Sequence, residues 1–153
     1  MKIKITYFYN IRYFKDYQIG LSTAMWQPKY WFFGQNKYGS VMGAYEKLLS
    51  PFKVHFQAPC KANCEYKGKS TLCPFLSLYE AYLDTLPIDK LLSSFNDLIN
   101  KVKAINNFKD EPEIILLVYE KPDNPCSERN SLIKYFKKFN IEVEEYIPNK
   151  NLS

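Results

Sequence analysis

The sequence lacks the features by which several classes of protein are recognised at once. No stretch of its 153 residues approaches the ~20 consecutive apolar residues that a membrane span needs. The opening MKIKITYFYN has no apolar signal core, and there is no Walker loop, internal repeat or basic tail. The single histidine, His55, belongs to no visible Ser-His-Asp motif. We therefore expect a cytoplasmic protein with no membrane partner, no Walker-type phosphate loop and no Ser-His-Asp triad.

Apolar and aromatic residues are plentiful instead. Hydrophobic residues make up 46% of the chain, aromatic residues 17% and charged residues 24%. A chain of this length and composition suits one domain with an ordinary core, and it is too hydrophobic to be disordered. The sequence predicts a single domain over residues 1–153, with a cysteine-containing insertion or loop at about residues 55–74.

Positive charge is concentrated in the first third of the chain. The formal net charge is +5, and residues 1–53 hold eight basic and two acidic residues. A basic and aromatic-rich segment could attract phosphates or single-stranded nucleic acid, whose bases stack on aromatic rings. The alternative is that Lys2, Lys4, Lys15 and Lys29 are ordinary solvated surface residues.

The spacing of apolar residues predicts alternating strands and helices. Strand patterns occupy residues 2–9, 17–24, 113–120 and 141–147. Helical spacing occupies residues 40–49, 75–86, 88–108 and 126–139. Because a strand, helix and strand with short links form a right-handed crossover, the last two strands should be parallel. We expect an α/β fold, a Rossmann-like three-layer sandwich in which helices flank a mostly parallel sheet.

The segment EKPDNPCSERN after the strand at 113–120 is the clearest candidate for a binding site. Ligands of open α/β sheets bind beyond the carboxyl ends of the strands. We expect Cys126 to lie in the first turn of the next helix, where free amides and the helix dipole favour an anion and lower the pKa of a thiol. Arg129 could then grip a phosphate or carboxylate. Alternatively, Asn124 caps the helix, Pro125 occupies its first position and Cys126 is an inert thiol.

Several short segments carry a resemblance to one protein family. They are Thr6–Asn10, Ser22–Thr23, Pro28–Trp31, Val118–Pro122, Cys126–Arg129 and Val143–Tyr146. In residues 5–31 and 113–146 the chain resembles the family called domain of unknown function 488. The corresponding family pattern is Thr-Ser-Tyr-Phe-Ala-Asn near the start, then Cys-Tyr-Glu-Lys-Pro, Cys-His-Arg and a strand ending in acidic residues and an aromatic.

The chain departs from that family at the Cys-His-Arg triplet. If Arg129 occupies the Arg position, Glu128 replaces the His, Ser127 replaces the Cys and Cys126 lies one residue earlier. The resemblance therefore implies a fold and a place for the site rather than a reaction.

If the first strand and the strand at 113–120 are neighbours, their ends form one electropositive cleft. The candidate ligand-binding residues are Tyr9, Asn10, Arg12, Trp26, Trp31, Lys121, Ser127, Arg129 and Asn130, and the candidate catalytic residues are Glu120, Glu128 and Cys126. Glu120 could act as a general base or bind a ribose hydroxyl, and the tryptophans could stack on a base. Alternatively, Glu120 and Lys121 pair with the arginines, and the tryptophans belong to an aromatic core patch.

Three of the four cysteines lie close together in the sequence. Cys60, Cys64 and Cys73, joined by His55 or Cys126, have the ligand types of a tetrahedral structural zinc site. Their spacing matches no standard zinc knuckle, and disulfides are disfavoured in the cytosol. The alternative is three free thiols in a loop. We otherwise expect no required cofactor.

These observations favour a protein that binds a nucleotide-like or other phosphorylated small ligand at the ends of its strands. Hydrolysis of that ligand and sequestration without catalysis both stay open, so we make no claim that the protein is an enzyme. A further alternative is single-stranded nucleic-acid binding through residues 1–38. The exposed side of the helix at 88–108 could also support a homodimer.

Overall fold

The chain folds around one parallel β-sheet. The computed structural model describes residues 1–28, 43–55, 64–65, 69, 73–105 and 109–149. In these ranges the five-stranded sheet has the order β3-β2-β4-β1-β5, and every pair of neighbouring strands is parallel. The strands are β1 (Ile3–Tyr7), β2 (Gln18–Ser22), β3 (Gly43–Tyr45), β4 (Glu113–Val118) and β5 (Val143–Glu145). The prediction of an α/β fold with a parallel sheet is confirmed.

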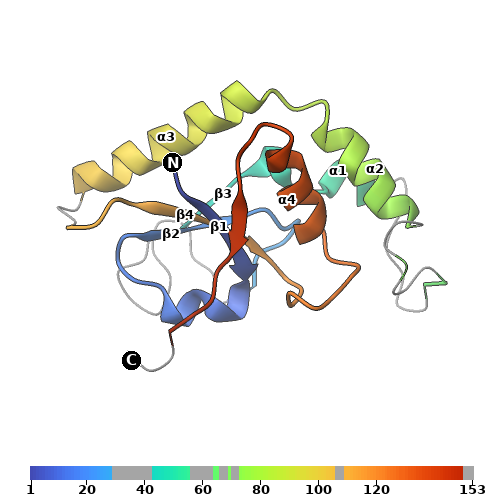
Figure 1. Cartoon of the computed structure of the whole chain (residues 1–153), viewed down its shortest axis with the longest axis horizontal. Helices are drawn as coiled ribbons and strands as arrows, with labels where there is room; N and C mark the ends of the chain where they lie inside the picture. Colours follow the sequence, from blue (N-terminus) through green and yellow to red (C-terminus); the bar gives the residue numbers. More distant parts are fainter. Residues whose placement is uncertain (29–42, 56–63, 66–68, 70–72, 106–108, 150–153) are drawn as a thin grey trace.

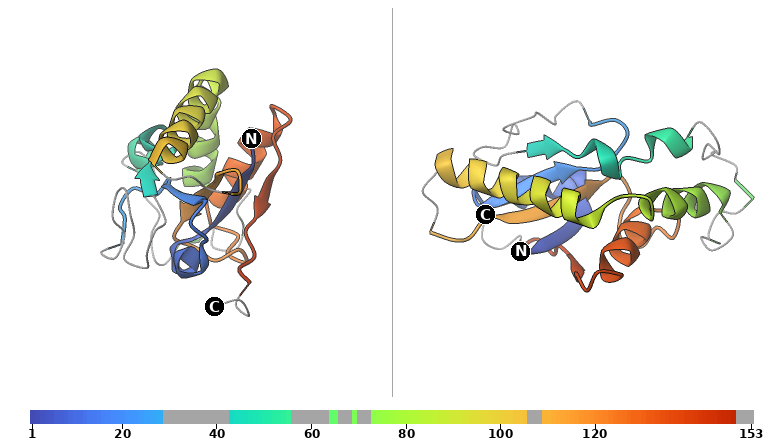
Figure 2. Two further views of the ribbon diagram at one scale, coloured as in Figure 1. Left: turned by 90° about the vertical axis from the view of Figure 1, so that its left-hand side faces the viewer. Right: turned by 90° about the horizontal axis from the view of Figure 1, so that it is seen from above.

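Helices lie on both faces of the sheet, which makes a three-layer sandwich (Figure 1). The α-helices are α1 (Phe52–His55), α2 (Pro74–Leu83), α3 (Ile88–Ile105) and α4 (Arg129–Lys137). They share one face, and α2 and α3 lie end to end above the strands (Figure 2). The 3₁₀ helix η1 (Phe8–Tyr13) covers the opposite face, and a shorter one, η2 (Lys47–Leu49), follows β3.

The central strand β4 shows why the core has two halves. Its sequence EIILLV is buried along its whole length, as expected for a strand covered on both faces. Successive side chains of a strand point to opposite faces. Ile114 and Leu116 therefore pack against α2, α3 and α4, whereas Ile115 and Leu117 pack with Phe8 of η1 and its neighbours.

The expected helix over 40–49 is wrong in the part that the structure describes. Residues Gly43–Tyr45 form β3 and pair in register with Gly20–Ser22 of β2. Glu46 then accepts a hydrogen bond from the backbone N–H of Leu48 at 3.2 Å, which begins η2. Pairing with a neighbouring strand has overridden the local apolar spacing, as tertiary context often does.

The helix expected from residue 126 begins only at Arg129. Asn124 Oδ1 accepts a hydrogen bond from the N–H of Cys126 at 2.9 Å, which folds residues 124–126 into a turn. Ser127 Oγ then accepts the N–H of Arg129 at 3.1 Å. These side chains compete with the helical hydrogen bonds, so the helix begins three residues later than its apolar periodicity predicts.

The other predicted elements are found close to their expected places. The strands at 2–9 and 17–24 appear as β1 and β2, and the helices at 75–86 and 88–108 as α2 and α3. Among the helices in the described ranges, none has both the length and the apolar content needed to cross a membrane.

Candidate functional site

Neighbouring strands β1 and β4 send the chain to opposite faces of the sheet. They pair in parallel from Ile3 with Ile114 to Tyr7 with Val118. After β1 the chain enters η1 on one face, and after β4 it enters α4 on the other (Figure 1). In open α/β sheets, such a switch point creates a crevice outside the carboxyl ends of the strands, where ligands bind. The prediction that these two strand ends lie side by side is confirmed.

Small polar side chains hold the ends of β1 and β2. The Asn10 side-chain amide donates a hydrogen bond to Thr6 Oγ1 at 2.8 Å, and both residues are buried. Thr23 Oγ1 donates to the carbonyl of Leu117 at 3.1 Å and joins β2 to β4. Burial of a hydroxyl or amide is tolerated when it is hydrogen-bonded. These residues therefore fix the geometry of the strand ends, with Asn10 on the η1 side.

Two glutamates lie after the end of β4, and their pKa values are raised. Burial is the larger cause for Glu128, which is only 9% exposed, and the nearby negative charge of Glu120 is the second; together they raise its pKa to about 8. Burial also raises the pKa of Glu120, but the hydrogen bond from Ser127 and the charge of Arg129 oppose that rise. The two carboxyl groups therefore differ in how readily they hold a proton.

Arg129 is buried at the start of α4 and is 1% exposed. Its Nη1 donates to the carbonyl of Glu120 at 2.6 Å, and its Nε lies 2.9 Å from Glu145 Oε1. A weaker hydrogen bond of 3.4 Å joins Nη2 to Glu145 Oε2. Because β1 lies between β4 and β5, the guanidinium spans the end of β1. The described contacts make Arg129 a tie between strand ends, whereas its contact with a ligand stays a prediction.

Arg12 lies on the other side of the switch point, in η1. Its Nε donates to the carbonyl of Tyr9 at 3.0 Å, and its Cζ lies 3.7 Å from the centre of the Tyr9 ring. The two arginines therefore come to the same end of the sheet, but α4 and η1 hold them over opposite faces. Lys121 and Asn130, also predicted to bind a ligand, are exposed near the end of β4.

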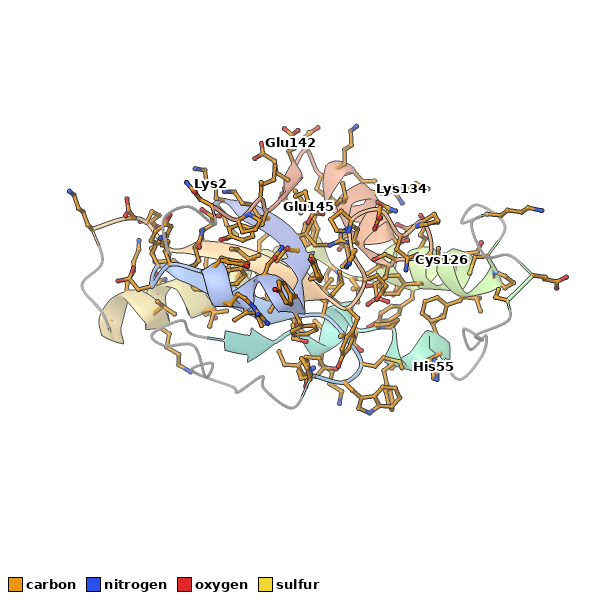
Figure 3. The ribbon with its side chains drawn as sticks, turned by 90° about the horizontal axis from the view of Figure 1, so that it is seen from below. Lys2, His55, Cys126, Lys134, Glu142 and Glu145 are labelled. Carbon is orange, nitrogen blue, oxygen red and sulfur yellow. The ribbon has the colours of Figure 1, made fainter. Side chains whose placement is uncertain are left out.

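Cys126 lies in the loop that leads into α4, and Glu145 lies on β5 (Figure 3). Cys126 is half-buried, and it precedes the first helical residue instead of lying in the first turn. The argument that a helix start activates its thiol therefore does not apply. A nucleophilic role for Cys126 stays a prediction.

The predicted zinc ligands are only partly within the described residues. Cys64 is half-buried and Cys73 is buried, whereas Cys60 lies outside the described residues. Among the residues that the structure describes, no group of three or more His, Cys, Asp or Glu side chains could hold a metal ion. Structural zinc at His55 and the cysteines therefore stays a prediction.

Trp26, one of the two tryptophans predicted to stack on a base, lies apart from the β1–β4 switch point. Trp26 is 61% exposed and packs edge-on against His55 of α1 at 6.1 Å between ring centres. Helix α1 follows β3, which is an edge strand of the sheet, whereas β1 and β4 are central. Trp31 lies outside the described residues.

Two residues of this region were not singled out from the sequence. Glu145, the partner of Arg129, enters the sequence analysis only as part of the acidic strand end Val143–Tyr146. Tyr79 is read as part of the apolar stripe of a helix, yet its pKa is raised well above its usual value by burial and by the charge of nearby Glu128. Its hydroxyl donates to the carbonyl of Leu49, so α2 is tied to η2 beside the glutamates.

Comparison with protein-family models, with curated proteins and with solved structures finds no match to this chain. The resemblance to the family called domain of unknown function 488 therefore stays a prediction.

Proposed function

We propose that this protein binds a nucleotide-like ligand at the carboxyl ends of β1 and β4 and hydrolyses it, with Glu128 as general acid and Glu120 as general base. The observation that carries the proposal is the pair of carboxyl groups that follows β4, buried Glu128 and half-buried Glu120, with the pKa of Glu128 raised to about 8. Strongly shifted carboxyl pKa values beside such a crevice are a frequent mark of catalytic sites.

The different surroundings of the two glutamates support different parts in the reaction. At pH 7 Glu128 holds a proton, which it can give to the departing oxygen or nitrogen of the ligand. Glu120 is kept more acidic by Ser127 and Arg129, so it can accept a proton from the attacking water. Water is added across the broken bond and the protons balance. Carboxyl pairs of this kind cleave glycosidic bonds.

Exposed cations near the strand ends support an anionic ligand. Arg12 follows β1 and Lys121 follows β4, and both side chains reach solvent. A neutral, protonated Glu128 does not repel a phosphate as an ionised one would. The resemblance of residues 113–146 to a family whose strand also ends in Tyr-Glu-Lys-Pro supports a site in this segment.

The test is to measure binding and turnover of a panel of nucleoside mono- and diphosphates by calorimetry and by release of base and phosphate. Turnover should fall about 100-fold or more in Glu128→Gln and in Glu120→Gln, because each variant lacks one proton-transfer group. Glu80→Gln, a glutamate of α2 paired with Lys134, is the matched control and should keep full turnover.

The pH dependence gives a second readout. Turnover should fall as the pH rises through about 8, where Glu128 loses its proton. Binding without turnover by the wild type would overturn the catalytic part and favour a protein that sequesters a nucleotide signal. No binding of any phosphorylated probe would overturn the proposal as a whole.

A further inference from the structure

Exposed Tyr9, the half-buried rings of Tyr7 and Tyr13 and one cation form a stack that begins at the end of β1. The rings of Tyr7 and Tyr9 are nearly parallel, with 6.1 Å between their centres and 14° between their planes. Tyr13 lies 6.4 Å from Tyr9 at a tilt of 57°. The guanidinium carbon of Arg12 is 3.7 Å from the centre of the Tyr9 ring. Tyr9 is thus the centre of the stack.

This stack is continuous with the strand-end site. Tyr7 is the last residue of β1 and pairs in register with Val118 of β4. The guanidinium of Arg129 spans the end of β1, from the carbonyl of Glu120 to the carboxylate of Glu145. The rings therefore lead from the end of β1 outward along η1.

Packing of the hydrophobic core does not explain the position of these rings. Phe8 and Ile11 of the same 3₁₀ helix are 2% and 1% exposed, and they anchor η1 to the sheet. Tyr9 is 44% exposed and Arg12 is also exposed. A segment that buries Phe8, Asn10 and Ile11 and presents a ring and a guanidinium to solvent is suited to recognition.

We propose that this stack binds the heteroaromatic base of the ligand. The inference rests on the proposed function and deepens it, because it requires that the ligand of the strand-end site carries a nucleobase. Bases stack on tyrosine rings and on the planar face of arginine, and they do so with little dependence on sequence. The base has two sources, a free nucleotide or a single-stranded nucleic acid.

The test compares the binding of three probes by calorimetry: adenosine monophosphate, ribose 5-phosphate and an eight-nucleotide single-stranded DNA. Tyr9→Ala should weaken adenosine monophosphate binding about tenfold, the loss expected for one stacked base. Ribose 5-phosphate, which has no base, should bind more weakly than the nucleotide and should be unaffected by the substitution.

The variant Tyr9→Phe is the matched control because it keeps the ring and removes only the hydroxyl. It should bind adenosine monophosphate as the wild type does. Since Tyr9 is half-exposed, both variants should fold, which thermal unfolding checks. The DNA could instead bind more tightly than adenosine monophosphate, in a salt-sensitive way, and lose affinity in Tyr13→Ala as well. That result would show that the base comes from a single-stranded nucleic acid.

The outcomes separate this inference from the proposed function. If ribose 5-phosphate binds as tightly as adenosine monophosphate, and Tyr9→Ala changes neither affinity, the stack does not bind a base, although the phosphate-binding site stands. If none of the three probes binds, both proposals fail.

Discussion

Two buried glutamates beside β4, Glu113 and Glu128, have opposite electrostatic surroundings. Glu113 begins the strand, and its Oε1 lies 3.1 Å from Nζ of Lys4 on neighbouring β1. Glu128 follows the other end of the strand, where its neighbour is a second carboxylate, Glu120, and its pKa is raised to about 8. A buried charge with a cation beside it serves the fold, whereas a buried carboxyl group that keeps its proton is available for chemistry.

The amino and carboxyl ends of β1 and β4 differ in the same way as these two glutamates. A cavity of about 590 Å³ lies at the amino ends of β1 and β4, lined by Lys2, Tyr17, Asn100, Lys103, Glu111 and Glu113 among others. It contains charges that are paired within the fold, such as Lys103 with Glu111 at 2.7 Å. The carboxyl ends instead present Glu120 and Glu128.

The largest expected effect comes from breaking the buried pair at the carboxyl end. Arg129→Ala should lower the free energy of unfolding by about 3–5 kcal/mol, because it leaves Glu145 without its cation and the carbonyl of Glu120 without its donor. Urea unfolding at pH 7 measures the change. Arg129→Lys, which keeps the charge but not the forked geometry, should lose less. A loss below about 1 kcal/mol for Arg129→Ala would contradict a tying role.

Replacing Glu128 should raise the free energy of unfolding at high pH, whereas replacing Arg129 lowers it. The pKa of Glu128 is raised, so its contribution to stability is full below the ordinary value of 4.5 and is lost as the pH rises through about 8. Glu128→Gln stays neutral and should be more stable than the wild type at pH 9, by on the order of 3 kcal/mol, but not at pH 4. Thermal unfolding across this pH range is the measurement. Equal stability at pH 9 would show that Glu128 is not buried in this way.

Removing the cation beside Glu113 converts the paired site into an unpaired one. Lys4→Met should cost about 2 kcal/mol at pH 7, because Glu113 is then buried without compensation. Adding Glu113→Gln should recover part of the stability, and a double-mutant cycle measures the coupling. Purely additive losses would mean that the pair does not compensate Glu113.

The smallest effect is expected where both partners reach solvent. Lys134 of α4 lies 3.1 Å from Glu80 of α2, and water screens the pair. Lys134→Ala should change the free energy of unfolding by no more than about 0.5 kcal/mol. Urea unfolding in low and high salt measures the change, and a clearly larger loss would contradict this expectation.

The sequence could predict those elements whose patterns are strong. The apolar run at 113–118 and the long stripe at 88–105 needed no tertiary information to be assigned as strand and helix. β3 could not be predicted, because three residues become a strand only when β2 lies beside them. The start of α4 was misplaced because hydrogen bonds from Asn124 and Ser127 outweigh the periodicity of the following residues.

The sequence could predict which segment forms the candidate site, but not what each of its side chains contacts. Its place follows from a general property of parallel strands, so Glu120 and Glu128 were identified as candidates. That Arg129 would pair with Glu145 and that Tyr9 would stack under Arg12 depended on the packing of η1 and α4. Neither the burial of a side chain nor its partner is a property of its own position in the sequence.

By itself, the sequence determined the parallel α/β class and which segments follow the carboxyl ends of the strands, because periodicity and strand-to-helix connections are local properties of the chain. Only the tertiary structure decided which buried charges are neutralised. The pKa of Glu128 depends on desolvation and on Glu120 nearby. The neutralisation of Glu145 depends on a guanidinium sixteen residues away in the chain. Both are effects of distance in space, which sequence order does not encode.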